Sequence, residues 1–395
     1  MTEKTSAILD LDGRKLTIEI GRLAQQSTSS ILARMGDTMV LVTVVEGDIR
    51  TDVDYFPLTV DYEERLYAGG RIKGSRWVKR EGRPSDDAIL SARLIDRSIR
   101  PLFPKEYKNE VQIIVTVLSV DGENAPDVLS IIAASTALAI SKIPWLGPIA
   151  GVRIGYIKEK VPTTVSGLEF LINPGMTELA LSELDLVVSG LKDKTIMIEA
   201  GTMQVPDEIV LEAIRRAQIE NSKIINFIED FVKKVGQKKE AITKDTTLAE
   251  LMQKIEKSYK DEVMKLVSER VNKESSGGAE DLIDAIYDNE QISNQEKALD
   301  KKLIAKAIEL VLYKIIRENI LNKGIRPDGR QTDEIRTISA QVSVLPRTHG
   351  SAIFQRGDTQ ALTVVTLGSP RLEQRIESPE GEESKRYIHH YSMPP

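Results

Sequence analysis

The sequence predicts an α+β protein with layered strands and helices, followed by an all-helical part and then by an incomplete second copy of the first strands. Three observations lead to this prediction. β-rich runs alternate with helical patterns in the first half, long amphipathic charged segments replace them from about Pro206, and a strand-turn-strand motif returns near the end. A chain of 395 residues is long enough for two or three domains. We expect domains at 1–235, 236–322 and 323–395.

The expected strands of the first domain are rich in Val, Ile, Leu and Thr and are bounded by Gly, Pro, Asn or Asp. They cover residues 16–23, 39–47, 111–120, 151–157, 168–174, 184–190 and 195–201. Between them, helical spacing predicts helices at 85–99 and 127–141. Ser85 is suited to cap the first of these, with Asp86 and Asp87 in its first turn and Pro101 at its end.

The middle of the chain lacks β-type runs and predicts helices only. Its amphipathic segments are 208–235, 248–271 and 297–319. SSGG at 275–278 indicates a break between helices, and GIRPDGR at 324–330 indicates a turn that ends the helical part.

An internal repeat joins the two ends of the chain. Residues 28–45 align with residues 349–366 at a constant offset, so that Gly36-Asp37-Thr38 falls on Gly357-Asp358-Thr359. Gly-Asp favours a hairpin turn in both copies. Residues 54–60 also resemble 390–395, after a longer charged insertion in the second copy. Chance similarity of short hairpins is the alternative, and the extended register favours duplication.

Composition restricts both the chemistry and the compartment. There is no cysteine, which excludes disulfides and thiolate chemistry, and the three histidines are His349, His389 and His390. The N-terminus lacks a signal-peptide pattern, and no apolar stretch is long enough to cross a membrane, so we expect a cytoplasmic protein without a membrane partner.

A concentrated basic segment suggests an anionic partner. The net charge of the chain is -6, but residues 65–105 hold eleven Lys or Arg and four acids. Within this segment, the loop 67–84 contains four glycines, Trp77 and six cations. Glycines allow close backbone approach, guanidiniums bind phosphates and an aromatic ring can stack on a base, which suits single-stranded RNA. The alternative is a solvated loop without function.

Three arginines form one stripe on the following helix: Arg93, Arg97 and Arg100. Asp96 lies one turn from Arg93 and Arg100, so a local network of ion pairs is as reasonable as RNA contact for Arg97 and Arg100. We favour RNA contact only for Arg93. Farther along, we interpret Glu178, Glu183 and Asp185 as solvated surface acids, and His349 as a structural histidine of a turn. His389 and His390 are neighbours in an expected strand, so at most one could face a site.

The stretch from Gly69 to Pro104, which contains LIDRSIRPLFP, resembles the polynucleotide phosphorylase family. The two GDT hairpins, the helical insert, GIRPDGR and LPRTHGSAIFQRGDTQAL follow in that family's order. The resemblance implies two ribonuclease PH-like cores joined by an all-helical domain, with KH and OB-fold domains beyond, and three chains in a ring around an RNA channel. It also implies a phosphorolytic 3'–5' exoribonuclease that uses inorganic phosphate and Mg²⁺ to release nucleoside diphosphates in mRNA degradation.

The resemblance also assigns the sites. The family's catalytic residues and Mg²⁺ ligands would lie beyond Pro395, in the second core. We therefore assign no catalytic or metal residue here, and we expect the first core to be silent and this chain by itself to be inactive in phosphorolysis. For RNA and phosphate binding, the resemblance and the basic pattern together give Arg76, Trp77, Lys79, Arg80, Arg83 and Arg93. Lys79 replaces a family arginine and loses its bidentate geometry.

Two functional hypotheses remain open for the chain. The first is the family's nucleotidyltransferase activity, and the second is a non-catalytic RNA-binding or ring-forming scaffold. A generic small-molecule enzyme has no nucleotide or metal motif to support it. We expect residues 323–395 to be the least stable part of the chain, with the polar segment 367–387 the first to be cleaved by a protease.

Overall fold

The structure is a computed structural model that describes residues 4–11, 13–50, 55–72, 82–158, 170–242, 247–272, 277–293 and 300–393. Contacts between residues divide the chain into two compact units. The first unit comprises Met1–Thr243 and Leu372–Pro395, and the second comprises Lys244–Arg371. The chain therefore leaves the first unit once and later returns to it.

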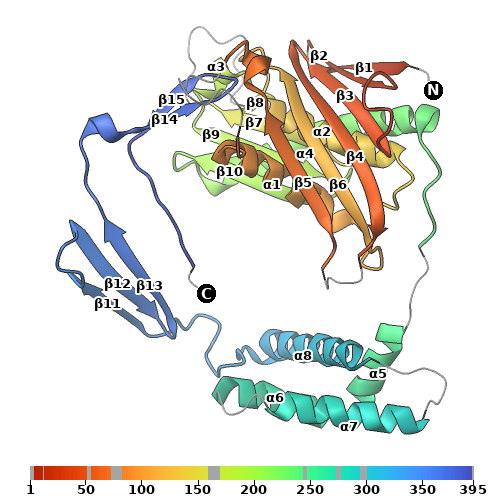
Figure 1. The fold of residues 1–395 in the computed structure, drawn as a ribbon, viewed down its shortest axis with the longest axis vertical. Coiled ribbons are helices and arrows are strands. Elements are labelled where there is room, and N and C mark those ends of the chain that lie inside the picture. Colours follow the sequence, from red (N-terminus) through yellow and green to blue (C-terminus); the bar gives the residue numbers. More distant parts are fainter. Residues whose placement is uncertain are drawn as a thin grey trace. The chain divides into compact units, whose positions relative to one another are not determined.

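A six-stranded sheet forms one layer of the first unit (Figure 1), with the strand order β1-β2-β3-β4-β6-β5. Only β5 and β6 pair in parallel, and the other neighbours are antiparallel. The strands are β1 (Thr5–Leu11), β2 (Arg14–Ile20), β3 (Ser29–Met35), β4 (Thr38–Ile49), β5 (Leu58–Glu64) and β6 (Asn109–Ser119).

A four-stranded antiparallel sheet of order β10-β9-β7-β8 forms the second β layer. Its strands are β7 (Ala150–Tyr156), β8 (Phe170–Ile172), β9 (Leu184–Gly190) and β10 (Thr195–Thr202). The longer helices of the unit are α1 (Asp86–Ile99), α2 (Pro126–Ile140) and α4 (Asp207–Val235), and the short ones are η1 (Leu66–Gly69), η2 (Arg100–Leu102) and α3 (Met176–Leu179). The strands and helices expected from the sequence in this region are confirmed where they are described; residues 168 and 169 of the expected strand 168–174 lie outside the described residues.

Helix α2 lies between the two sheets, because it packs on β3 and β4 on one side and on β7 on the other. Its residues are almost all buried, which explains why the helix is apolar all round rather than amphipathic. Its hydroxyl groups bond to backbone groups, as Ser130 Oγ does to Pro126 O at 2.6 Å and Thr136 Oγ1 to Ile132 O at 2.7 Å. Helix α4 packs on β7 and β9.

One carboxylate ties the first hairpin to the start of α2. Asp121 accepts hydrogen bonds from Asp37 N (2.9 Å), Thr38 Oγ1 (3.0 Å), Glu123 N (2.9 Å) and both side-chain and backbone nitrogens of Asn124 (2.7 and 2.8 Å). Partial burial alone would raise the pKa of Asp121, but these donors outweigh it and hold the pKa well below its usual range. The Gly-Asp-Thr turn is therefore fixed to the segment before α2.

The chain leaves the first unit beside the end of α2. Gln237 N donates to Ile140 O at 2.8 Å, and Lys239 Nζ donates to Leu138 O and Ser141 O at 2.7 and 2.9 Å. The ammonium group thus caps the carbonyl end of the helix, where a cation is favourable. Burial lowers the pKa of Lys239 to about 8.

The second unit contains four helices among its described residues and a three-stranded sheet of order β11-β12-β13. Helix α8 packs against α5, α6 and α7 around an apolar cluster. The bounds are α5 (Thr247–Ser258), α6 (Lys260–Asn272), α7 (Gly277–Ser293), α8 (Lys301–Lys323), β11 (Ile338–Val342), β12 (Gly350–Arg356) and β13 (Thr359–Val365).

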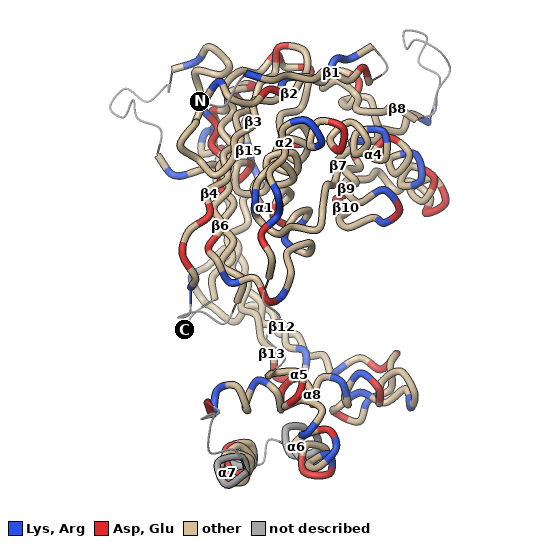
Figure 2. Tube along the Cα trace, turned by 90° about the vertical axis from the view of Figure 1, so that its right-hand side faces the viewer, with Lys and Arg blue, Asp and Glu red and all other residues tan. Residues whose placement is uncertain are grey.

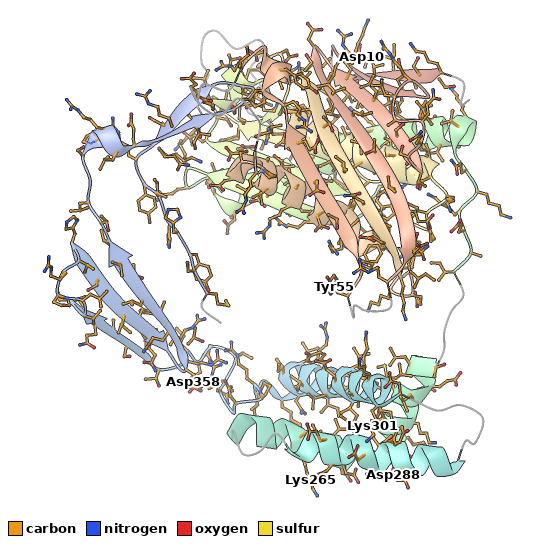
Figure 3. All side chains as sticks on the ribbon, in the orientation of Figure 1. Asp10, Tyr55, Lys265, Asp288, Lys301 and Asp358 are labelled. Atoms are coloured by element: carbon orange, nitrogen blue, oxygen red, sulfur yellow. The ribbon has the colours of Figure 1, made fainter. Side chains whose placement is uncertain are left out.

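The structure confirms the internal repeat. In the first copy Met35 pairs with Thr38, and in the second copy Arg356 pairs with Thr359, which is the register that the constant offset requires. Gly36 and Gly357 both adopt a φ of 59° at the turn, and Asp358 lies at this turn in Figure 3. The face that α2 covers in the first copy is exposed in the second, where Phe354 is 48% exposed.

The chain returns to the first unit as the hairpin β14 (Gln374–Glu377) and β15 (Glu382–Lys385). A tight turn joins the strands, with Ser378 N donating to Gly381 O at 2.8 Å. Pro379 at this turn is buried. A buried residue therefore lies at the centre of the segment 367–387, whose early cleavage by a protease stays a prediction.

We expect Asp121→Asn to lower the free energy of unfolding by about 2–3 kcal/mol, because an amide cannot accept all the hydrogen bonds that the carboxylate accepts. A folded-state pKa below the usual range stabilises the protein above about pH 4, and this stabilisation is lost as the pH falls toward the lowered pKa. The variant should therefore differ most from the wild type at neutral pH and converge with it in acid. Urea unfolding from pH 7 to pH 2 would measure this. Asp48→Asn, at an exposed residue of β4, is the control and should change nothing.

Candidate functional site

The residues proposed for RNA binding fall into two groups. Arg76, Trp77, Lys79 and Arg80 lie outside the described residues. Arg83 and Arg93 are described, and both are exposed. The structure therefore bears on these two positions and on the helix that carries Arg93.

Helix α1 begins at the residue that the sequence predicts. Ser85 Oγ accepts a hydrogen bond from Ala88 N at 3.0 Å and donates to Glu64 Oε2 at 2.7 Å, so the cap is itself held by β5. Asp86 and Asp87 occupy the first turn, where negative charge is favourable. Acidic and basic side chains both occur along α1 (Figure 2).

Arg93 projects from the middle of α1 and has no hydrogen bond or ion pair to any described residue. Its side chain lines a shallow pocket of about 230 Å³, together with Asp61, Pro84 and Asp96. An exposed guanidinium without a fixed partner is free to bind a phosphate.

The other two arginines of the stripe are engaged within the protein. Arg97 pairs with Glu199 and donates to Ile198 O at 3.2 Å. Arg100 forms two hydrogen bonds with Asp96, at 2.7 and 2.9 Å, and donates to the carbonyl oxygens of Phe56 and Leu58, which precede and begin β5. Of the alternatives considered for Arg97 and Arg100, the structure therefore favours ion pairing.

A second candidate site is a pocket of about 430 Å³ between β5, α1, α2, β7, β9 and the returning hairpin β14–β15. Carboxylates dominate its lining, and Arg153 of β7 is the only cation among the lining residues. The carboxylates are those of Glu64, Asp87, Asp127, Asp185, Glu380, Glu382 and Glu383.

Arg153 is already neutralised within this pocket. Its Nη2 lies 2.9 Å from Asp127 Oδ2, and its Nε lies 2.9 Å from Asp185 Oδ1. Its side chain is 13% exposed, and although burial by itself lowers the pKa of Arg153, the two carboxylates raise it. The remaining carboxylates give the pocket an excess of negative charge.

This excess alters the titration of its neighbours. Burial and the charges of Asp127, Glu64 and Glu380 raise the pKa of Tyr62 well above its usual value. The pKa of Glu64 is raised by burial and by Asp87, although the hydrogen bond from Ser85 opposes this. Restricted contact with water and the charges of Asp127 and Glu64 raise the pKa of Glu380. Such a pocket repels phosphate and attracts protons and cations.

The hairpin that closes this pocket rests against the backbone of η1. A Cβ atom at Gly69 would lie 1.8 Å from Pro379 O, so only a glycine allows the two segments to approach this closely. The close approach brings Glu380 beside the strands and helices of the first copy.

The sequence interpretation of the acids in this region needs correction. Asp185 pairs with Arg153, and Glu178 pairs with Arg14 at 3.1 Å, so neither is simply a solvated surface acid. Sequence reasoning also missed Arg153, Asp127 and Glu380. A single arginine within the apolar run GVRIGYI is the signal that could have indicated a buried ion pair.

The histidines have structural surroundings. His349 Nδ1 accepts a hydrogen bond from Leu367 N at 2.8 Å, which confirms its predicted role in a turn. His389 and His390 lie in a segment, 386–393, that is not a strand, so the argument from opposite strand faces was wrong. The rings of Tyr387 and His389 meet edge to face, with centroids 6.4 Å apart.

No group of three or more His, Asp or Glu side chains within the described parts of the chain could hold a metal ion. None of the described helices is long and apolar enough to cross a membrane.

Comparison with known families assigns nearly the whole chain. A model of the 3' exoribonuclease family, domain 1, matches residues 12–144 and again 334–395, and the model of domain 2 of that family matches 147–220. Residues 245–331 match a model described as polyribonucleotide nucleotidyltransferase, RNA binding domain. The repeated match to domain 1 agrees with the duplication found above, and the predicted fold class is confirmed.

Curated relatives match over the same extent. Polyribonucleotide nucleotidyltransferase of Caldicellulosiruptor bescii is 46% identical over 98% of this chain and 54% of the relative. Those of Roseiflexus castenholzii and Halothermothrix orenii are 44% and 42% identical, over 99% and 98% of this chain and 51% and 54% of the relatives. The chain thus spans about half the length of these relatives. The crystal structure of rice (Oryza sativa) Rrp46 matches 58% of this chain and 95% of that chain, with a TM-score of 0.44 and 14% identity.

We predict that Arg93→Ala weakens RNA binding, because it removes a guanidinium that no carboxylate occupies. Loss of one phosphate contact should lower the slope of log K against log salt by about 0.7 for a single strand. Arg97→Ala is a matched control on the same helix, because Arg97 already pairs with Glu199. Fluorescence anisotropy with a labelled oligoadenylate would measure both slopes. Equal slopes for the wild type and Arg93→Ala would show that Arg93 does not touch phosphate.

We also predict that Gly69→Ala releases the β14–β15 hairpin, because the new methyl group would collide with Pro379 O. Limited proteolysis should then cut residues 372–393 faster, while the strands of the first sheet stay protected. Gly201→Ala is the control, because a Cβ atom there meets nothing within 4 Å. A cleavage rate unchanged by Gly69→Ala would contradict the observed packing.

Proposed function

This chain belongs to the polyribonucleotide nucleotidyltransferase family, and from that membership we propose that its protein is a phosphorolytic 3'–5' exoribonuclease acting in mRNA degradation. The observation that carries the proposal is the identity of 46% over 98% of the chain, which extends through both α/β parts and the helical part. An oxygen of inorganic phosphate attacks the terminal phosphorus of RNA. The bond from that phosphorus to the 3' oxygen of the preceding nucleotide breaks, this oxygen takes up a proton, and a nucleoside diphosphate leaves.

We assign RNA handling, rather than bond cleavage, to the described residues. Arg93 is the supporting feature, because its exposed guanidinium has no partner among them and lies on the helix that follows the loop 67–84. Arg83 precedes the cap of the same helix and is also exposed. One cation just before α1 and another in its middle could contact successive phosphates of a single RNA strand.

The carboxylate pocket supports the assignment of a non-catalytic role to the first unit. Phosphorolysis must bring a phosphate dianion next to a phosphodiester, and both are repelled by carboxylates. Arg153, the cation of this pocket, already pairs with Asp127 and Asp185. A phosphate entering here would have to displace a carboxylate from Arg153 and lie beside the others.

The remaining expectations belong to the complete protein. We propose a ring of three chains, a location in the cytoplasm, and a requirement for Mg²⁺, whose ligands would come from outside the described residues. A non-catalytic, RNA-binding or ring-forming chain is the alternative, and the carboxylate pocket favours that role for the first unit alone.

The proposed reaction is tested by its product. The complete protein, incubated with oligoadenylate, inorganic phosphate and Mg²⁺, should release ADP in proportion to the phosphate supplied. Release of AMP would indicate hydrolysis and overturn the proposal. Asp185→Asn should change the rate of ADP release less than about two-fold, because that side chain lies in the pocket to which no chemistry is assigned. A loss of activity in a correctly folded Asp185→Asn protein would place chemistry in the first copy.

A further inference from the structure

A groove of about 390 Å³ lies in the second unit where α6, α8 and the turn after α8 meet. This volume falls in the range of about 300–1,000 Å³ that is common for ligand sites. The groove is lined by Met264, Ile316, Asn319, Lys323, Ile325, Arg326 and Pro327.

The walls of the groove are apolar and partly exposed. Met264 contributes from α6 and Ile316 from α8, and the turn adds Ile325 and Pro327. Met264 and Ile325 are each 43% exposed, so these apolar surfaces are open to a ligand. A flat apolar partner such as a nucleobase would gain by leaving water here.

Polar groups lie at defined places along one side. Asn319 and Lys323 are one turn apart on α8, and Ile316 is one turn earlier, so the three follow one face of the helix. The amide of Asn319 can both donate to and accept from a base edge. Lys323, in the last turn of α8, is exposed and places its ammonium group at the end of the groove.

Arg326 provides a second cation that is held in place by the turn. Its backbone N donates to Arg330 O at 2.9 Å, and its Nη2 donates to Thr332 O at 2.6 Å. The αL conformation of Gly324, with a φ of 66°, ends α8 and directs the chain into this turn. Lys323 and Arg326 therefore flank the same groove from two elements.

The lining of the groove carries a net positive charge. It contains two cations and no acid. Elsewhere on α8, Lys301 pairs with Asp284 of α7 at 2.6 Å and Lys314 pairs with Glu256 of α5 at 2.6 Å. Lys301 lies on α8 and Asp288 on the neighbouring α7 in Figure 3. The unpaired positive charge at the groove is what an anionic ligand would require.

We propose that this groove binds one nucleotide of single-stranded RNA, with the base against the apolar walls and a phosphate between Lys323 and Arg326. The inference rests on the proposed function, which makes RNA the substrate. The matched RNA binding domain covers residues 245–331, which include the whole groove, but its description does not locate the RNA. The combination of apolar walls, an amide and two cations is the chemistry of a nucleotide, with an apolar part beside an anion.

The test uses the full chain and an oligoadenylate that carries one 4-thiouridine for ultraviolet crosslinking. Lys323→Glu removes the exposed cation, and Met264→Asp places a charge in the apolar wall at a partly exposed position. Lys306→Glu is the matched control, because it makes the same change on α8 at an exposed lysine about 25 Å along the helix. Circular dichroism would check that each variant folds.

We expect crosslinks in peptides from α6 and from residues 316–327. Lys323→Glu should lower the salt slope of binding by at least about 0.7 and should remove these crosslinks, whereas Lys306→Glu should do neither. Met264→Asp should remove the crosslinks as well. Crosslinks that persist in both groove variants would overturn the inference. So would equal effects of Lys323→Glu and Lys306→Glu, or a change of oligomeric state in Met264→Asp without a change in RNA binding.

Failure of this inference is distinguishable from failure of the proposed function. Release of ADP by the complete protein without groove crosslinks would keep the phosphorolytic activity and remove only the groove site. Groove crosslinks without release of ADP by the complete protein would keep the RNA site and remove the activity.

Discussion

The arrangement of the first unit depends on a cluster of hydrogen bonds that one carboxylate, that of Asp121, accepts. The turn of the β3–β4 hairpin exposes an N–H and a hydroxyl toward the segment before α2, and that segment exposes further N–H groups of its own. Asp121 accepts from both sides, so the first sheet and the central helix share a common point of attachment. Because α2 packs on both sheets, the position of its first turn also determines how those sheets lie against each other. Gly36 is needed at the turn because its φ of 59° is unfavourable for a side chain and because a Cβ atom would meet Asn124 and Asp121.

The described arginines of the first unit discussed above fall into two groups, those with an ion pair and those without one. Arginines that hold the architecture are paired, as Arg100 is with Asp96 and Arg153 is with Asp127 and Asp185. Arg93 belongs to the other group, because it forms no ion pair with any described residue. The carboxylates of the pocket add an electrostatic constraint, since they would repel RNA there, which agrees with the RNA path along α1 that we propose.

Local signals allowed much of this fold to be predicted from the sequence. Ser85 and the two aspartates after it predicted the start of α1. The constant offset between the Gly-Asp-Thr motifs predicted that both hairpins share one register. The pocket could not be predicted in the same way. Arg153 meets Asp127 and Asp185 only because β7, α2 and β9 come together in space, and Glu380 arrives from a hairpin more than 190 residues after Asp185 along the chain. The sequence also could not show that Arg97 and Arg100 are engaged within the protein while Arg93 is not. Their partners Glu199, Phe56 and Leu58 are distant in sequence and come close only in the folded chain.

The route of the chain has a consequence for how the molecule holds together. The second unit is inserted rather than appended, because the chain is pinned at Lys239 where it leaves the first unit and at Pro379 where it has returned. Docking of β14–β15 therefore closes a loop within one molecule. The entropic cost of closing this loop rises only slowly with the length of the connecting chain. The tether supplies a high effective concentration, so even a small contact can remain closed. A single nick in the connection between α8 and β11 would cut no described helix or strand. It would nevertheless turn this intramolecular closure into an association between two separate fragments, which dilution weakens.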